Sequence, residues 1–274
     1  MLFKLKQAIA DNDILSASLW LAHEFSAEKT LDVAYYQSLL TEWAAQAKVT
    51  ARIEQPDEAA FARFICFFYV DLAFSGDEKN YFSCKYSLLN QVIDYRTGIP
   101  VSLAIVFQSL AKQLGFDVQG VNFPGHYLLR YQVKPSHCLY IDPLNGTLLS
   151  AWDLEQLYFN ILSEIDDEKM PQEALAPAKC DESVMRLLHN LKAAYINEKA
   201  FSKALLAVEL LVSLRPDDPY ERRDRGFLLH QLDCTQVAIA DYQYFVRRCP
   251  KDPATQLLEA QIRQLTDHPP VILH

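Results

Sequence analysis

Apolar residues recur at steps of three and four along the first third of the chain, which is the spacing of a helix with one buried face. This pattern predicts three helices, over residues 16–25, 31–47 and 59–74. The third is apolar almost all round, so we expect it to lie in the middle of a core. A polar stretch with a turn signal at Gly76 ends this helical region.

A fourth apolar helix is predicted over residues 101–114, because Pro100 precedes it and Gly115 follows it as a stop. Helical spacing returns over residues 154–165, with Asp153 expected as the cap. Between these helices the chain has short, partly alternating runs rich in Val, Leu, Ile and Tyr. They predict a small antiparallel sheet packed on the fourth helix, with strands over residues 117–123, 126–133 and 138–141.

A charged segment with two prolines, residues 168–183, interrupts the pattern. We expect it to be a linker between a domain of residues 1–167 and a helical domain of residues 184–274.

An internal repeat follows the linker. Ala204 recurs as Ala238 and Pro216 as Pro250, both at an offset of 34 residues, which is the period of tetratricopeptide helix pairs. The sequence therefore predicts two helix pairs, beginning near residues 184 and 218. Because two repeats are fewer than the usual minimum of three, we expect them to pack against the first domain.

Composition narrows the classes of function. The chain has 35 acidic and 26 basic residues without a basic stripe, so nucleic acid is not an expected partner. No signal peptide and no apolar run of about 20 residues is present, which predicts a cytoplasmic protein that does not enter a membrane. The six cysteines are expected to be reduced, and their spacing suggests no metal site. With seven glycines and no phosphate-binding loop, no cofactor is expected.

Three polar residues carry the candidate chemistry. Ser102 starts the fourth helix, His126 starts a strand and Asp142 ends the next one, in the order nucleophile, base and orienting acid of a catalytic triad. Gly125 would let a substrate or another backbone approach His126 closely. Asn90 lies upstream, where its amide could hydrogen-bond into the pocket, although a place on a helix surface is the alternative.

The segments GIPVSLA, FPGHYLLRY and YIDPLNG, followed by helical repeats, resemble the SirB-type bacterial proteins. The resemblance implies an α+β, mainly helical fold: a papain-like or transglutaminase-like core with a small antiparallel sheet, then an α-helical tetratricopeptide domain. It also implies a histidine and an aspartate at His126 and Asp142, but a cysteine where this chain has Ser102.

Two functions are open at this point. The first is a cytoplasmic interaction or regulatory protein with a weak or inactive core, whose repeats bind a protein or peptide. The second is a hydrolase or acyl transferase that attacks an amide or ester through Ser102, His126 and Asp142. A relict pocket that still binds a peptide or acyl group is a further alternative.

Each triad residue also has an ordinary structural role. Ser102 could satisfy free amides at the helix start, since a serine hydroxyl gains little acidity from the helix dipole. His126 could be hydrogen-bonded at a strand edge, and Asp142 before Pro143 could form a turn.

Arg222 and Arg225 lie three residues apart on one predicted helix face. Arginine binds a carboxylate through two parallel hydrogen bonds, so we expect this pair to clamp an acidic group. The group could belong to a partner or could join the two domains, and a solvated charged face is the alternative. The sequence does not indicate an oligomeric state.

Overall fold

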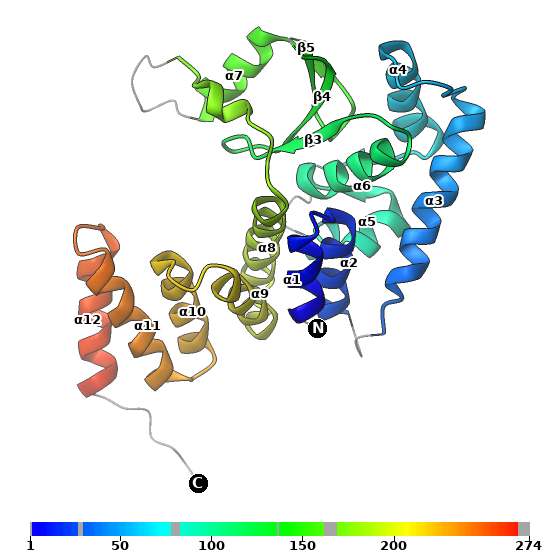
Figure 1. Cartoon of the computed structure of the whole chain (residues 1–274). Helices are drawn as coiled ribbons and strands as arrows, with labels where there is room; N and C mark the ends of the chain where they lie inside the picture. Colours follow the sequence, from blue (N-terminus) through cyan, green and yellow to red (C-terminus); the bar gives the residue numbers. More distant parts are fainter. Residues whose placement is uncertain (1, 27–29, 78–82, 136, 162–168, 268–274) are drawn as a thin grey trace. The chain divides into compact units, whose positions relative to one another are not determined.

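The computed structural model describes residues 2–26, 30–77, 83–135, 137–161 and 169–267 (Figure 1). The chain forms two compact units, Met1–Leu187 and Leu188–His274. The division falls inside helix α8 (Cys180–Asn197), which begins a few residues before the predicted start. Residue 168 lies outside the described residues, and the predicted linker stays a prediction.

The first unit begins with four helices. Three aspartates set their starts, because the carboxylates of Asp13, Asp32 and Asp57 each accept a hydrogen bond from the backbone amide three residues ahead. The helices are α1 (Leu2–Ala10), α2 (Ile14–Phe25), α3 (Val33–Thr50) and α4 (Glu58–Cys66).

The third predicted helix is not regular to its end. After α4 the chain continues as a π-helical turn over Phe67–Asp71, in which the Leu72 amide donates to the Phe67 carbonyl at 2.8 Å. Both Phe67 and Phe68 are buried there. The wider turn lets adjacent phenylalanines face the core, which explains the apolar run without polar interruptions.

Helix α6 (Pro100–Gln113) is the centre of this unit, since 11 of its 14 residues are buried. Helix α5 (Leu89–Tyr95) precedes it and was not predicted. A short parallel pair, β1 (Ser75–Gly76) with β2 (Thr97–Gly98), ties the loop before α5 to the start of α6.

The predicted antiparallel sheet is confirmed, in the order β3-β4-β5-β6. It lies beside α6 in Figure 1, and the Tyr131 ring stacks on Phe61 with centroids 4.0 Å apart. Its strands are β3 (Val118–Val121), β4 (Leu128–Lys134), β5 (His137–Ile141) and β6 (Leu148–Leu149).

Helix α7 (Ala151–Ile161) follows the sheet, and its cap differs from the predicted one. Ser150 precedes the helix, and its hydroxyl accepts from the Asp153 amide at 3.2 Å. The Asp153 carboxylate reaches back to the Ser150 amide at 2.8 Å. The two residues form a reciprocal capping box, in which Asp153 is the inner member.

The second unit consists of antiparallel helix pairs, as the 34-residue offset predicts. Ala204 and Ala238 are fully buried, and a Cβ atom at Gly226 would lie 2.8 Å from the Tyr242 ring. Small residues at these three places therefore allow the helices to pack closely. The helices after α8 are α9 (Phe201–Leu214), α10 (Pro219–Gln231), α11 (Thr235–Arg248) and α12 (Ala254–Asp267).

None of the helices in the described ranges combines the length and the apolar composition that crossing a membrane requires.

Candidate functional site

His126 and Asp142 are brought together at the end of the sheet. Nε2 of His126 lies 3.2 Å from Oδ1 of Asp142, out of line for a hydrogen bond, and both side chains are largely buried. Gly125 has a φ of 64°, a left-handed conformation that turns the chain into His126. The two predicted site residues are therefore adjacent, and their roles as base and orienting acid stay a prediction.

Asp142 also forms a turn, the ordinary role considered for it. Its Oδ1 accepts from the Leu144 amide at 2.9 Å, and its carbonyl accepts from the Gly146 amide at 2.8 Å. One oxygen thus holds the turn and faces the imidazole, which fixes the position of the carboxylate.

Ser102 does not join this pair. Its Oγ lies 2.6 Å from the Tyr86 carbonyl oxygen and 3.0 Å from that of Ile99, and it accepts from the Ile99 amide at 3.1 Å. The residue is fully buried, and a Cβ atom at Gly98 would lie 2.6 Å from its Oγ. Among the residues that the structure describes, no hydrogen bond connects Ser102 with His126 or Asp142.

The chemical consequence concerns the hydroxyl proton. A serine nucleophile needs a base within hydrogen-bond reach of its hydroxyl. Here the acceptors around Oγ are backbone carbonyls, and the hydroxyl reaches back from the third helical position to the Ile99 amide. The geometry is that of a helix start held by its serine.

Asn90 is buried rather than on a helix surface, and its Oδ1 has no hydrogen-bond partner. On the same helix, Asp94 accepts from the Tyr36 hydroxyl at 2.9 Å. Burial first, and then Asp94, raise the pKa of Tyr36, while a hydrogen bond with Asn90 opposes that shift. Asn90 therefore belongs to the contact between α3 and α5.

Tyr69 contributes to the site without having been predicted. Its hydroxyl donates to the Pro143 carbonyl at 2.9 Å, next to Asp142. Burial, and to a smaller extent the charge of Asp142, raise the pKa of Tyr69, so the phenol remains protonated. Nothing distinguishes this tyrosine in the sequence, because it lies within a long apolar run.

The loop that carries His126 is held by the start of α8. Arg186 donates to the His126 carbonyl at 3.4 Å and to Oδ1 of Asn122 at 3.3 Å. The Tyr127 and Ser183 hydroxyls lie 2.7 Å apart. The first turns of α8 thus hold the loop of His126 in place, Ser183 from the end of the predicted linker and Arg186 from the start of the predicted helical domain.

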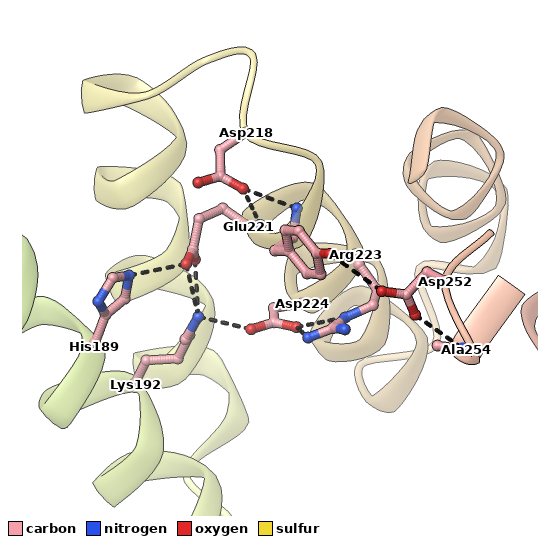
Figure 2. A network of polar contacts seen from close by, with 9 residues as sticks. His189, Lys192, Asp218, Glu221, Arg223, Asp224, Asp252 and Ala254 are labelled. Atoms are coloured by element: carbon pink, nitrogen blue, oxygen red, sulfur yellow. Dashed lines mark hydrogen bonds and ion pairs between the residues drawn. The ribbon is translucent and has the colours of Figure 1, made fainter. Parts of the chain in front are cut away.

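The repeat unit has a polar network of its own, shown in Figure 2. Lys192 on α8 is buried, and its Nζ binds Glu221 at 2.8 Å and Asp224 at 2.7 Å on α10. His189 adds a contact of 2.9 Å to Glu221, and Arg223 binds Asp224 at 2.9 Å. The network therefore fixes the first helix of one pair against the first helix of the next.

Arg225 holds Asp241 in the bidentate geometry expected from the sequence, at 2.6 and 2.7 Å. Arg222 lies 3.5 Å from the same carboxylate and donates to the Pro216 carbonyl at 3.4 Å. These contacts join α10 to α11 and to the preceding turn, so they lie within the repeat unit. A partner-binding or interdomain role for the two arginines stays a prediction.

In the described part of the chain, no three His, Cys, Asp or Glu side chains gather closely enough to hold a metal ion.

Comparison with known proteins matches a family model to each of the two units. The model of the transglutaminase-like superfamily matches residues 34–189, and a tetratricopeptide-repeat model matches residues 191–263. The chain belongs to the transglutaminase-like superfamily. The resemblance seen in the sequence is thereby confirmed, and so is the α+β, mainly helical fold followed by repeats.

Several bacterial proteins match the chain over most of their length. A UPF0162 protein of Vibrio cholerae is 34% identical over 262 residues, which cover 96% of each chain. UPF0162 protein YchA of Escherichia coli is 34% identical over 219 residues, or 80% of each chain. Protein SirB1 of Salmonella typhimurium is 30% identical over 230 residues, or 84% of each chain. No solved structure matches the chain.

Within the described residues of this transglutaminase-like core, His126 and Asp142 lie side by side, and the Ser102 hydroxyl binds backbone groups instead of them. The membership therefore establishes the fold and leaves the chemistry to be tested.

Proposed function

We propose that this protein is a cytoplasmic interaction protein whose transglutaminase-like core is catalytically inactive and whose repeats bind a segment of a partner protein. The observation that carries the proposal is the state of Ser102, which is fully buried with its hydroxyl bound to backbone groups. Substrate cannot reach such a hydroxyl unless the start of α6 opens.

Opening that helix start would be costly. The single hydroxyl proton is directed at the Tyr86 and Ile99 carbonyls, and the oxygen accepts from the Ile99 amide. One donated and one accepted hydrogen bond would be lost, each worth about 0.5 to 1.5 kcal/mol. Even then, Ser102 would have to turn toward His126. These costs favour an inactive core over the hydrolase or acyl transferase.

The repeats offer a surface for a partner on α10. Tyr220 is 47% exposed and Phe227 is 40% exposed, and their spacing of seven residues puts them on one helix face. Arg223 lies between them, with its guanidinium over the Tyr220 ring at 5.3 Å. Tetratricopeptide repeats generally mediate protein interactions, and exposed aromatic and arginine side chains are common anchors in interfaces.

A serine-directed fluorophosphonate probe tests the core. The wild-type protein should remain unlabelled, as should the Ser102→Ala variant, while an active serine hydrolase in the same mixture is labelled. Stoichiometric labelling of Ser102 that His126→Ala abolishes would overturn the inactive core and establish the hydrolase.

The repeat surface is tested separately. Photo-crosslinking from position 223 should yield a defined partner, and Tyr220→Ala with Phe227→Ala should remove that product. Val237→Ala is a matched control, because Val237 is also exposed but lies on α11. A product that survives the double change, or that Val237→Ala removes equally, would contradict partner binding by α10.

A further inference from the structure

Helix α7 presents two aromatic side chains to solvent on one face. Trp152 is 67% exposed and Phe159 is 39% exposed, and they lie two helical turns apart. Leu148, 52% exposed, precedes the helix on β6. Large apolar side chains that gather on a surface mark an interaction site more often than single ones do.

The exposure of this outer face does not come from a loosely packed helix. On its inner side, Leu154 is buried in a cluster with Val121 and Phe123, and Leu157 and Tyr158 pack against the same cluster. Tyr158 meets the Phe123 ring edge-on, with centroids 6.2 Å apart. The inner side chains therefore hold the helix in place without Trp152 and Phe159. These two side chains are free to be buried against another molecule.

Charge indicates the chemistry of that molecule. From residue 135 to residue 168 the chain has no Lys or Arg and has seven acidic residues: Asp142, Asp153, Glu155, Glu164, Asp166, Asp167 and Glu168. Glu155 is exposed on α7, one turn from both Trp152 and Phe159. Residues 1–187 contain 24 acidic and 15 basic residues, whereas residues 188–274 contain 11 of each, so the core carries the whole net charge of −9.

We propose that the outer face of α7, formed by Trp152, Glu155 and Phe159, docks a basic amphipathic segment of another protein. Apolar side chains of that segment would cover Trp152 and Phe159, and its Lys or Arg would face the exposed carboxylate of Glu155. A second copy of this chain is disfavoured, because a two-fold contact through this face would bring like charges together. An anionic membrane would be repelled by the same carboxylates.

The test uses the full chain and a fluorescein-labelled, 14-residue helical peptide of Leu and Lys with one apolar face. Fluorescence anisotropy should show saturable binding that weakens as salt rises from about 50 to 200 mM. The double change Trp152→Ala with Phe159→Ala should weaken binding at least about tenfold. Tyr95→Ala is the matched control, because Tyr95 is equally exposed on α5, and it should bind as the wild type does.

A charge-reversal variant distinguishes binding at this face from non-specific attraction between the basic peptide and the acidic protein. Glu155→Lys should weaken binding of the Leu/Lys peptide and strengthen binding of a Leu/Glu peptide with the same pattern. Circular dichroism confirms that each variant is folded. Equal affinity of the wild type and the double variant, or no saturable binding, would overturn the proposal. A concentration-dependent dimer in sedimentation, lost in the double variant, would also overturn it, because it would identify a second copy as the occupant.

Discussion

At the scale of single residues, the hydroxyl of Ser102 reinforces a contact between two segments that also share a backbone hydrogen bond, from the Ile99 amide to the Tyr86 carbonyl at 3.4 Å. It joins the start of α6 to the Tyr86 carbonyl, and it satisfies the buried Ile99 amide. The same side chain that suggests a nucleophile is therefore part of the packing of the core.

We expect Ser102→Ala to lower the free energy of unfolding by about 1 to 2 kcal/mol, since it removes the hydroxyl's donated hydrogen bond and leaves the Ile99 amide only its longer bond of 3.4 Å to the Tyr86 carbonyl. Ser109→Ala is the control on the same helix, because the Ser109 hydroxyl only donates to the Ile105 carbonyl at 2.6 Å and no amide depends on it. Urea unfolding followed by circular dichroism measures both. Equal losses would show that the amide of Ile99 does not need Ser102.

The sequence could predict the partners His126 and Asp142 but not the direction of Ser102. A histidine before one strand and an aspartate after the next converge because adjacent antiparallel strands place those ends side by side. The side-chain direction of Ser102 depends on Gly98 and Tyr86, which no spacing identifies. Tyr69 was missed because it lies within a long apolar run that predicts only a buried helix.

At the scale of elements, the joint between α8 and α10 depends on buried charge. Lys192 lies between Glu221 and Asp224, and all three must be present for the charges to be compensated. Removing one partner of a buried ion pair costs more than the pair itself contributes.

Lys192→Met should therefore lower the stability of the protein by about 3 kcal/mol. Lys251→Met is the control, since Lys251 is exposed after α11. Thermal unfolding compares the two. A Lys192→Met protein as stable as the control would mean that His189 alone compensates Glu221.

The same joint predicts a dependence on pH. Burial raises the pKa of Glu221, but hydrogen bonds and charges from His189 and Lys192 outweigh burial and lower it below its usual 4.5. Its contribution to stability is thus full above about pH 4.5 and is lost as the pH falls through the lower, folded-state pKa.

Urea unfolding between pH 7 and pH 3 measures this loss. Glu221→Gln should lose less stability than the wild type over that interval, because glutamine does not titrate. Parallel pH profiles of the two proteins would contradict the assignment.

Helices and strands with long, regular patterns could be predicted, and those governed by local geometry could not. The π-helical turn after α4 has no signal in a period of 3.6 residues, because it presents adjacent phenylalanines to one side. Strand β6 and the pair β1–β2 are two residues long each, too short to show alternation. Capping of α7 by Ser150 was missed because Asp153, one turn further in, is also a residue type that caps helices.

At the scale of the whole molecule, the two compact units share helix α8. Its first eight residues belong to the first unit, where Val184 and Leu187 are fully buried. A domain boundary drawn between units would therefore cut a helix.

A fragment of residues 180–274 should melt at a higher temperature than one of residues 188–274, since the shorter fragment loses the first turns of α8. For domains of this size each kcal/mol lost lowers the melting temperature by about 4 to 8 °C. Differential scanning calorimetry gives both values. Equal melting temperatures would show that residues 180–187 do not stabilise the repeat unit.

The 34-residue period could be read from four residues, because close helix packing allows only small side chains at Ala204 and Ala238. The start of the repeat unit could not be predicted in this way. Pro171 and Pro177 are typical of a linker, yet the Ala178 amide beside them donates to the Gly120 carbonyl of the first unit at 2.8 Å.

The absence of Lys and Arg around α7 also determines how this region can be followed in the laboratory. Trypsin cuts after Lys and Arg but not before proline, and Lys134 is followed by Pro135. A complete digest therefore releases residues 131–169 as one peptide, which contains Asp142 and the whole of α7. Footprinting of Trp152 by mass spectrometry needs a protease that cuts after glutamate, which divides that peptide at Glu155, Glu164 and Glu168.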